Sequence, residues 1–552
     1  MKSRIEGLLK AALRSAVDAG ELKSGEAPGL TVEHPKDRMH GDLASNAAMM
    51  LARTEKRAPR AIAETILAHL EDPHGWIEAT EIAGAGFLNF RLAPPFFHAI
   101  LRDLIAGDDL GVAASGKGKR VQVEFVSANP TGPLTVGHGR NAVLGDSIAR
   151  VLQATGHDVQ REYYFNNAGR QMKVLGDSVR ARYLEILGRE SAFPEDGYQG
   201  DYIRDIAQGL VDRDGDSLAE HEGTAFREAA ESGIFAEIRK TQDRLGIRFD
   251  NYFNEDTLYS SGAIERMLEA LEAHDLVVRR DGAVWLRGEA LGLNKDRVLV
   301  KGSGEPAYRL PDMAYHANKL GRGFDEVVVV LGADHIAESQ EVKLGLEGVG
   351  LDASKIRPII YQFVTLTRNG EQVKMSTRRA EYVTLDELVD EVGTDAVRFF
   401  FLSRKSDTHL DFDLELAKKR STDNPVYYVQ YAHARIANLF GQARERGIEL
   451  PTGAPTLEEL APLVLPEERE LITALAGYGE VIAAASAELE PHRLVFYLRD
   501  LAAALHRFYN KYRVLGDDTE PRVQARLHLL GMVQRVVAGG LGVLGVDAPE
   551  RM

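Results

Sequence analysis

A turn between an expected strand and an expected helix contains residues that could hold a nucleotide. The strand is expected over residues 121–126 and the helix over 141–155, and the turn includes Gly137, His138 and Gly139. Glycines without side chains let a nucleotide lie close to the backbone, and the free N–H groups of a helix start favour phosphate. His138 adds a hydrogen-bond donor at the same place. The pattern therefore predicts a phosphate-binding site.

Two kinds of nucleotide site fit this turn. As a bare pattern, Gly137-His-Gly139-Arg-Asn-Ala142 fits the dinucleotide fingerprint G-x-G-x-x-A, with Asp158 or Glu162 about 20 residues farther along. That fingerprint expects a glycine directly after the strand, whereas roughly ten residues intervene here. Thr135-Val-Gly-His138 instead resembles the (His/Thr)-x-Gly-His signature of adenylate-forming and nucleotidyl-transferring enzymes. Such chemistry depends mainly on positioning and charge stabilisation, because the attacking carboxylate is already ionised.

A basic run far downstream could act on the same nucleotide. Lys374-Met375-Ser376-Thr377-Arg378 follows an expected strand at 358–364 and a polar turn. A loop of this composition beside a nucleotide can neutralise the charge that develops on pyrophosphate. Alone, such a run is more often a solvated surface. Its place downstream of the phosphate-binding turn favours a catalytic role for Lys374, assisted by Arg378.

Together these residues resemble the class I aminoacyl-tRNA synthetases, and more closely the arginyl-tRNA synthetases. The resemblance extends over nearly the whole chain, and the stretches that carry it, besides the two motifs above, are residues 41–47, 84–89, 124–130, 164–171, 308–316, 332–335, 424–435 and 545–552. An ordered series of this length is far more specific than any single motif.

The resemblance implies an arginine site. A carboxylate and an amide near the first strand hold the substrate in this family, and a tyrosine and an aspartate four residues apart complete the pocket. The matching residues are Glu124, Asn129, Tyr308 and Asp312. Asp334, at the end of a later strand, is expected to line the same pocket. A guanidinium is planar, always charged and rich in donors, so a buried site for it needs carboxylates. Taken alone, Glu124 could be a surface acid of an edge strand and Tyr308 a packing residue.

The resemblance also implies the ATP site and its catalytic residues. The ATP contacts would be Thr135, Gly137, His138, Gly139, Gln362, Lys374, Met375 and Ser376, and the catalytic residues would be His138, Lys374 and Arg378. Two positions depart from the commonest family pattern. Thr135 stands where many relatives have a histidine, and Thr377 stands where many have a second lysine. The sequence contains no metal cage, so Mg²⁺ is expected to arrive with ATP, and no tightly bound cofactor is expected.

The C-terminal part interleaves aromatic and basic residues as an RNA-binding surface would. Tyr431 and Arg435 lie on one expected helix and Tyr509 on another, and the chain ends at Met552. Aromatic rings beside cations suit unpaired bases, so the resemblance to an anticodon-binding domain assigns these four residues to tRNA. An ordinary bundle core with charged flanks would use some of the same aromatics.

The elements that must position these residues form three units. Strands alternate with helices in the middle of the chain, which predicts an α/β catalytic domain with a Rossmann-like, doubly wound parallel sheet at 118–405, carrying an insertion at about 180–300. An α+β domain that contacts tRNA is expected at 1–112. Amphipathic patterns alone follow, so an all-helical, anticodon-binding bundle is expected at 406–552.

Composition narrows the class of protein. The chain has 552 residues, 44% hydrophobic and 27% charged, and a formal net charge of −16, which argues against indiscriminate binding to nucleic acid. It contains no cysteine, which excludes thiol chemistry and fits a reducing cytoplasm. No apolar run in the sequence is expected to approach the ~20 residues that a membrane span requires. We therefore expect a cytoplasmic monomer without a membrane partner.

These observations favour an arginine–tRNA ligase whose partners are L-arginine, ATP and the tRNA for arginine. The class resemblance implies that the 2′-hydroxyl of the terminal ribose receives arginine, and the arginyl subgroup usually requires bound tRNA for activation. Two other classes stay open, namely a stand-alone nucleotidyltransferase and a non-catalytic RNA-binding relative. A dehydrogenase is the weakest alternative.

Overall fold

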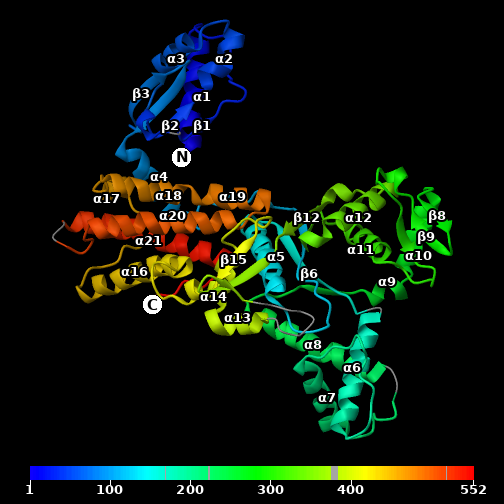
Figure 1. Ribbon diagram of the computed structural model, residues 1–552. Helices are drawn as coiled ribbons and strands as arrows, with labels where there is room; N and C mark the ends of the chain where they lie inside the picture. The colour runs from blue at the N-terminus through cyan, green and yellow to red at the C-terminus, as the bar shows by residue number, and fades with distance from the viewer. Residues whose placement is uncertain (36, 168–169, 222–223, 374–382, 517–518) are drawn as a thin grey trace.

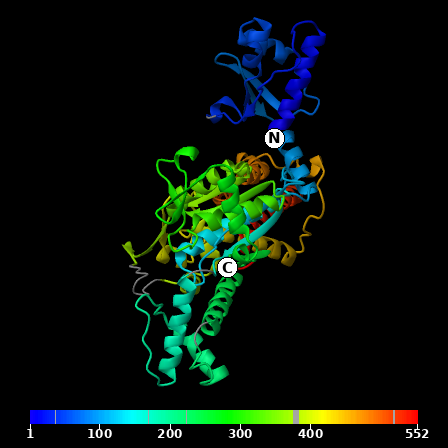
Figure 2. The same cartoon turned by 90° about the vertical axis from the view of Figure 1, so that its right-hand side faces the viewer.

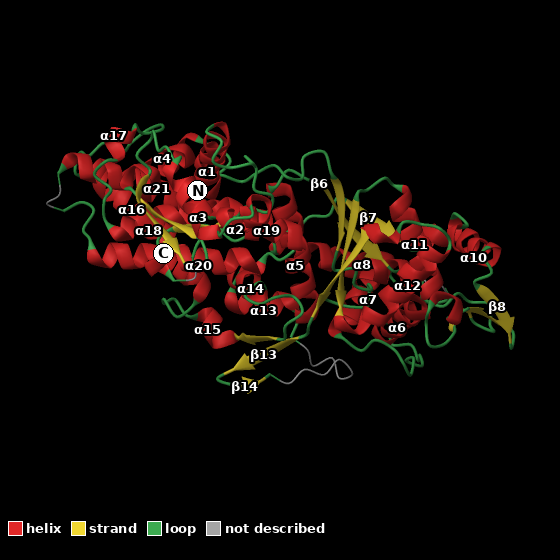
Figure 3. Ribbon diagram, turned by 90° about the horizontal axis from the view of Figure 1, so that it is seen from above, coloured by secondary structure: helices red, strands yellow, loops and turns green. Residues whose placement is uncertain are grey.

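The middle of the chain folds around a five-stranded parallel sheet flanked by helices (Figures 1 and 3). A computed structural model of the chain describes residues 1–552 except 36, 168–169, 222–223, 374–382 and 517–518. The strands, in chain order, are β5 (Arg120–Glu124), β6 (Asp158–Phe165), β7 (Asn251–Asn254), β11 (Glu326–Gly332) and β12 (Ile356–Tyr361). Their order in the sheet is β12-β11-β5-β6-β7, and every neighbouring pair is parallel. The expected α/β catalytic fold is confirmed.

The strand order reverses between β5 and β11. The chain leaves β5 toward β6 on one side and later returns as β11 on the other side. In open parallel sheets, ligands bind beyond the carboxyl ends of the strands at such a reversal. Helix α5 (Val136–Ala154) begins near this edge and contacts β5, β6 and β11. The fold therefore brings the phosphate-binding turn to the place where a nucleotide site is expected.

The strand expected over residues 358–364 is wrong in its extent. β12 ends at Tyr361, and β13 (Val364–Arg368) belongs to a second sheet of order β14-β13-β15, with β14 at Glu371–Gln372 and β15 at Leu410–Asp413. The break has a tertiary cause, because Arg140 of α5 donates to the carbonyl oxygen of Gln362 at 2.6 Å. The N–H of Gln362 donates to the carbonyl oxygen of Ser406 at 2.9 Å. Gln362 is thereby removed from the ladder of the parallel sheet.

The segment expected as an insertion contains two bodies with a sheet strand between them. Helices α6 (Arg170–Ile186), α7 (Asp201–Asp214) and α8 (Thr224–Arg244) pack on one another and project from the sheet (Figures 1 and 2). β7 then joins the sheet edge. The second body shares an apolar core with β11 and β12 of the sheet and extends beyond residue 300. It comprises α9 (Asp256–Ser260), α10 (Ala263–Ala273), β8 (Val277–Arg280), β9 (Ala283–Leu286), β10 (Arg297–Val300), α11 (Arg309–Gly321) and α12 (Ile336–Gly348).

The N-terminal residues form a separate α+β unit that extends away from the sheet (Figure 2). Its strands pair in the order β1-β2-β4-β3 and are antiparallel. The elements are α1 (Lys2–Asp18), β1 (Val32–Glu33), β2 (Leu43–Ser45), α2 (Ala47–Glu55), α3 (Pro59–Ala68), β3 (Ile77–Ala83) and β4 (Phe87–Leu92). Ile5, Leu9 and Leu13 lie fully buried on one face of α1, as the helical periodicity predicts.

The next helix attaches this unit to the opposite end of the chain. Helix α4 (Pro94–Ala106) packs against α17 (Leu457–Leu460), α18 (Pro466–Ala476) and α21 (Glu520–Leu544). The Nε2 atom of His98, on α4, lies 2.8 Å from the carbonyl oxygen of Leu463. Burial lowers the pKa of His98, so the neutral ring can donate this bond over the physiological range.

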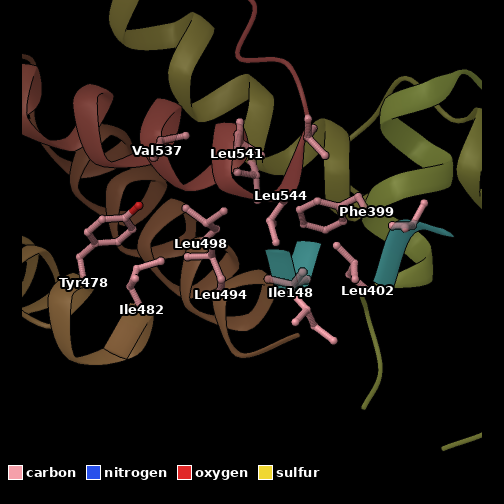
Figure 4. Close-up of a cluster of buried hydrophobic side chains, with 14 of the residues drawn as sticks. Ile148, Phe399, Leu402, Tyr478, Ile482, Leu494, Leu498, Val537, Leu541 and Leu544 are labelled. Carbon is pink, nitrogen blue, oxygen red and sulfur yellow. The ribbon is translucent and has the colours of Figure 1, made fainter. Parts of the chain in front are cut away.

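The C-terminal residues form the expected helical bundle. Its elements are α16 (Pro425–Glu445), α17, α18, α19 (Tyr478–Glu488), α20 (His492–Lys511) and α21, and they follow α13 (Leu385–Val392), α14 (Thr394–Phe401) and α15 (Leu414–Lys418). Figure 4 shows that this bundle shares a core with the catalytic domain. Ile148 of α5 and Phe399 of α14 pack beside Leu494, Leu498 and Leu541. The C-terminal bundle is thus continuous with the helix that begins at the phosphate-binding turn.

Among the residues that the structure describes, one helix is long and apolar enough to cross a membrane by length and composition. It is α21, so the expectation that no apolar run approaches this length is wrong. More than half of its apolar window is buried against other helices, among them α16, α18 and α20. The core helix of a soluble bundle has the same composition, because it is surrounded by apolar neighbours.

Candidate active site

The chain turns sharply directly after β5. Val126 and Ser127 have φ values of 64° and 42°, a left-handed conformation that costs residues other than glycine about 1–3 kcal/mol each. Asn141 of α5 supports the turn, since its side chain accepts from the N–H of Val126 at 2.6 Å and donates to the carbonyl oxygen of Val330 at 3.0 Å. One buried amide therefore holds the ends of β5 and β11 and the strained turn together.

Glu124, the last residue of β5, is buried and has two partners. Its Oε1 accepts from the hydroxyl of Ser127 at 2.9 Å, and its Oε2 contacts the ammonium group of Lys319 on α11. The same serine oxygen accepts from the N–H of Tyr164 at 3.1 Å. The alternative of a surface acid is excluded for Glu124, which is 6% exposed. Lys319 is a partner that the sequence reasoning missed.

Thr135 and His138 together cap the start of α5. The N–H of Thr135 donates to Nδ1 of His138 at 3.1 Å, in a reciprocal capping arrangement. Because Nδ1 accepts this bond, the proton of the neutral ring lies on Nε2. Burial lowers the pKa of His138, which favours this neutral form. His138 therefore offers one N–H donor beside the free N–H groups of the helix start.

The two glycines of the turn have different surroundings. A β-carbon at Gly137 would lie 3.7 Å from the hydroxyl of Thr135 and would meet little else. A β-carbon at Gly139 would lie 2.5 Å from Leu385 and 3.0 Å from Phe401. Gly139 is thus needed for the packing of α5 against α13 and α14. Gly137 is the one that leaves space at the turn.

Asp312 lies in a partly buried group of carboxylates. It is in the first turn of α11, near Glu124, Glu255 and Glu338. Burial, followed by the repulsion of these three acids, raises the pKa of Asp312 to about 7, whereas Lys319 acts in the opposite direction. The pKa of Glu255 is raised as well, mainly by burial. Glu255 precedes α9 and had no sequence signal, because its approach to Asp312 depends on the packing of α9 against α11.

The other expected arginine contacts have different surroundings. Tyr308 is 69% exposed at the start of α11, so it is not a packing residue. Asn129 donates to the side-chain oxygen of Gln171 at 3.1 Å. Asp334 is exposed and lies 3.6 Å from the ring of His335, which also approaches Glu338 at 3.5 Å. Hydrogen bonding to Glu338 is the main cause of the raised pKa of His335.

The expected lysine-loop residues Lys374, Met375, Ser376 and Arg378 lie outside the described residues. The chain on both sides of them is described. Val373 donates its N–H to the carbonyl oxygen of Leu366 at 2.9 Å. Thr384 forms a β-bridge with Thr135, and the N–H of Leu385 donates to the carbonyl oxygen of Leu134 at 2.8 Å. The downstream end is therefore attached to the phosphate-binding turn. Among the residues that the structure does describe, no group of three or more His, Asp or Glu side chains could hold a metal ion.

A second candidate site lies in the helical bundle. All four residues expected to contact tRNA, Tyr431, Arg435, Tyr509 and Met552, line one hollow of about 830 Å³. The guanidinium of Arg435 lies 3.9 Å from the ring centroid of Tyr509 and 5.8 Å from that of Tyr431. Stacked rings beside a cation form a surface on which unpaired bases can lie.

Three known families match successive parts of the chain. The family described as arginyl tRNA synthetase N terminal domain matches residues 3–92. The family described as tRNA synthetases class I (R), catalytic domain, matches residues 100–196. The family described as DALR anticodon binding domain matches residues 429–552. Their order agrees with the order of the three units of the fold.

Curated proteins and solved structures are similar over nearly the full length. The chain is 48% identical to the arginine–tRNA ligase of Desulfotalea psychrophila, over 100% of both chains. It is 47% identical to that of Chlorobaculum tepidum, over 95% of this chain and 96% of the relative. The Thermus thermophilus arginyl-tRNA synthetase structure matches with a TM-score of 0.72 at 25% identity, over 99% of this chain and 100% of the other. A putative arginyl-tRNA synthetase from Campylobacter jejuni matches with a TM-score of 0.75 at 30% identity, over 84% and 100%.

Proposed function

The chain belongs to the arginyl-tRNA synthetases, and on that premise we propose which of its residues bind arginine, ATP and tRNA. The enzyme joins L-arginine to its tRNA in two steps. The carboxylate of arginine attacks the α-phosphate of ATP, which gives arginyl-adenylate and pyrophosphate. A hydroxyl of the terminal ribose then attacks the activated carbonyl and releases AMP. We assign the 2′-hydroxyl to this second step.

The guanidinium of arginine lies between Asp312 and Glu255. The observation that carries this assignment is the group of carboxylates around Asp312, whose pKa is raised to about 7 by burial and then by the repulsion of the neighbouring acids. A bound guanidinium would relieve that repulsion and offer five donors to the acids. Glu124 and Asn129 face the amino group, and Tyr308 and Asp334 line the entrance. An ammonium group such as that of lysine cannot bridge two acids in the same planar way.

The triphosphate of ATP lies along the start of α5. The Nε2 proton of His138 and the free N–H groups of the helix donate to phosphate oxygens, and Gly137 keeps the approach open. Thr135 can donate its hydroxyl, and Gly139 and Gln362 shape the wall of the site. Lys374 and Arg378, with Met375 and Ser376, neutralise the charge that develops on pyrophosphate. Mg²⁺ arrives with ATP, because six-coordinate magnesium is commonly held by substrate phosphates.

ATP–pyrophosphate exchange tests this proposal. Exchange is measured with arginine, lysine and ornithine as separate substrates, each with and without tRNA. We expect exchange with arginine alone, because only a guanidinium can bridge Asp312 and Glu255, and only when tRNA is present. Exchange with lysine at a similar rate would contradict the two-acid pocket. Full exchange without tRNA would contradict the proposed order of binding.

The hollow of the bundle binds the anticodon. The interleaved Tyr431, Arg435 and Tyr509, with Met552 at the chain end, support this assignment. We expect Arg435→Ala to raise KM for tRNA about tenfold, because a base loses a stacked and charged neighbour. Exchange at saturating tRNA should change little, since the hollow lies on α16 and α20 of the bundle, whereas Asp312 lies on α11. Deletion of Met552 should act in the same direction. Arg493→Ala, on α20 but outside the hollow, is the control, and an equal loss in both assays would make Arg435 merely structural.

We also propose that the enzyme is a cytoplasmic monomer that works without a membrane. A chain of 552 residues without cysteine fits a reducing compartment. The apolar helix α21 packs against its neighbours in the bundle, which accounts for its composition. Sedimentation of the purified protein at micromolar concentration tests the monomer, and a stable dimer would contradict it.

A further inference from the structure

Lys319 is a fully buried lysine beside the proposed arginine site. It lies on α11, seven residues after Asp312, so both side chains belong to the same face of the helix. Its ammonium group contacts Oε2 of Glu124 from β5. An ammonium is costly to bury without a partner, so a lysine at this position has to be explained by the group that it contacts.

The side chain of Lys319 is held from a second direction. Its Nζ lies 4.2 Å from the ring centroid of Tyr315, one turn earlier on the same helix. The hydroxyl of Tyr315 donates to Oε1 of Glu162 at 2.7 Å, and Glu162 is fully buried between Tyr315, Arg322 and Asn251. The ring that supports Lys319 is thus fixed by a closed network. Lys319 has little freedom to leave Glu124.

The orientation of Glu124 is fixed by two different partners. The hydroxyl of Ser127 donates to Oε1 of Glu124 at 2.9 Å, and the ammonium group of Lys319 contacts Oε2. Ser127 belongs to the strained turn after β5, whereas Lys319 belongs to the helix of Asp312. The carboxylate of Glu124 is therefore held between the turn after β5 and helix α11.

We propose that Lys319 is a positioning residue of the arginine site, which orients the carboxylate of Glu124 and balances one of the negative charges gathered around Asp312. The inference rests on the proposed placement of arginine. Four acids gather here, and one of them, Glu338, lies 3.5 Å from the ring of His335. The other three, Glu124, Asp312 and Glu255, share one ammonium, so they keep two uncompensated negative charges when all are ionised. Arginine brings two positive charges, on its guanidinium and its amino group. With Lys319 in place, the pocket and the substrate match in charge.

The protonation of Asp312 reports the effect of Lys319. The groups that face Asp312 are Glu338 from α12, Glu124 from β5, Glu255 before α9, Lys319 from its own helix and, beyond Glu338, His335. Lys319 lowers the pKa of Asp312, and the acids raise it. Without the ammonium, the pocket keeps a proton to a higher pH, and arginine must displace that proton on binding.

The test compares Lys319→Gln with the wild-type enzyme over pH 6–9 in aminoacylation at saturating ATP and tRNA. Glutamine can still donate to Glu124, so it removes the charge and keeps the hydrogen bond. We expect KM for arginine to rise about tenfold at pH 7 and the gap to narrow at pH 9, with kcat changed less than about threefold. Lys319→Arg, which keeps the charge, should restore most of the wild-type pH profile.

Three further variants make the outcome decisive. Lys343→Gln is the matched control, because Lys343 is a partly buried lysine on α12 that donates to the carbonyl oxygen of Ile356 at 2.9 Å. An unchanged pH profile in Lys319→Gln, or an equal change in Lys343→Gln, would overturn the inference. If Lys319→Gln fails to fold, the double variant Lys319→Met with Glu124→Gln, which buries no charge at the pair, replaces it. Asp312→Asn separates the two proposals, since an unchanged KM for arginine there would refute the placement of arginine itself.

Discussion

Replacing Asp312 by asparagine is expected to lower kcat/KM for arginine about 10²–10³-fold at pH 8. Asparagine keeps the size of the side chain but removes the charge that the guanidinium would meet. Removing one partner of a buried, hydrogen-bonded charge pair costs about 2–5 kcal/mol, and each 1.4 kcal/mol is tenfold in affinity. The loss should fall mainly on KM, because the role proposed for Asp312 is contact with the side chain of arginine rather than with the reacting atoms.

The pH profile distinguishes this role from a structural one. The pKa of Asp312 is raised to about 7, first by burial and then by Glu338, Glu124 and Glu255. Below that pH the free enzyme holds a proton that arginine must displace. The wild-type kcat/KM for arginine should therefore rise with pH through about 7. The inflection should be absent in Asp312→Asn. His335→Asn is the control, because the pKa of His335 is also raised, and it should retain the inflection.

The same substitution should stabilise the enzyme when arginine is absent. The folded-state pKa of Asp312, about 7, lies above the ordinary value of 3.8. Between those values the folded chain holds a proton that the unfolded chain has lost, so stability falls as pH rises through this window and stays lower above it. We therefore expect Asp312→Asn to raise Tm at pH 8 and to leave it nearly unchanged at pH 3.5. A lower Tm at pH 8 together with lost activity would show that Asp312 is needed for folding.

Local signals in the sequence were sufficient for the phosphate-binding turn. A glycine-rich turn before a helix is defined by neighbouring residues, so the positions of Thr135, Gly137 and His138 follow from residues only a few positions apart. The grouping of the bundle residues in one hollow follows for a related reason. Tyr431, Arg435 and Tyr509 lie on long amphipathic helices, and a bundle aligns such faces over many turns. The assignment of Asp312 depended on the order of motifs along the whole chain, which resembles that of the arginyl-tRNA synthetases.

Contacts between distant residues could not be predicted in this way. The partner of Glu124 is a lysine 195 residues later, and a lysine near the end of a polar helix is usually solvated. The break after Tyr361 depends on Arg140, which lies 222 residues before Gln362. Glu255 reaches Asp312 only because α9 packs against α11. In each case the residue acquires its role from tertiary packing, and no local pattern records that packing.

Arg398→Met is expected to lower the free energy of unfolding by about 3–5 kcal/mol, because it leaves a buried carboxylate without its main partner. Arg398 and Asp146 are both essentially inaccessible, and a guanidinium N–H of Arg398 donates to the Asp146 carboxylate at 2.6 Å. Burial alone would raise the pKa of Asp146, but Arg398, Arg150 and Arg161 outweigh it and lower that pKa. The methionine has a similar length and no charge.

Arg398 also joins three parts of the molecule. Its Nε donates to the carbonyl oxygen of Leu544 at the end of α21, and another N–H donates to that of Leu245 after α8, at 2.9 and 2.8 Å. Asp146 lies on α5, which begins at the turn that contains Thr135, Gly137 and His138. The loss of stability should therefore appear in the first unfolding transition of the whole chain, measured in urea. Arg507→Met is the matched control, because its ion pair with Glu470 is exposed and should contribute less than about 1 kcal/mol.

The pH dependence fixes the sign of the Asp146 contribution. A carboxyl group whose pKa is lowered on folding stabilises the protein above its unfolded-state value, and this stabilisation is lost as pH falls through the folded-state value. The difference in stability between the wild type and Asp146→Asn should therefore shrink toward acidic pH. Combining Arg398→Met with Asp146→Leu should cost less than the sum of the single changes, because neither charge is then left alone. Additive costs would mean that Arg398 stabilises the junction through Leu544 and Leu245 and not through Asp146.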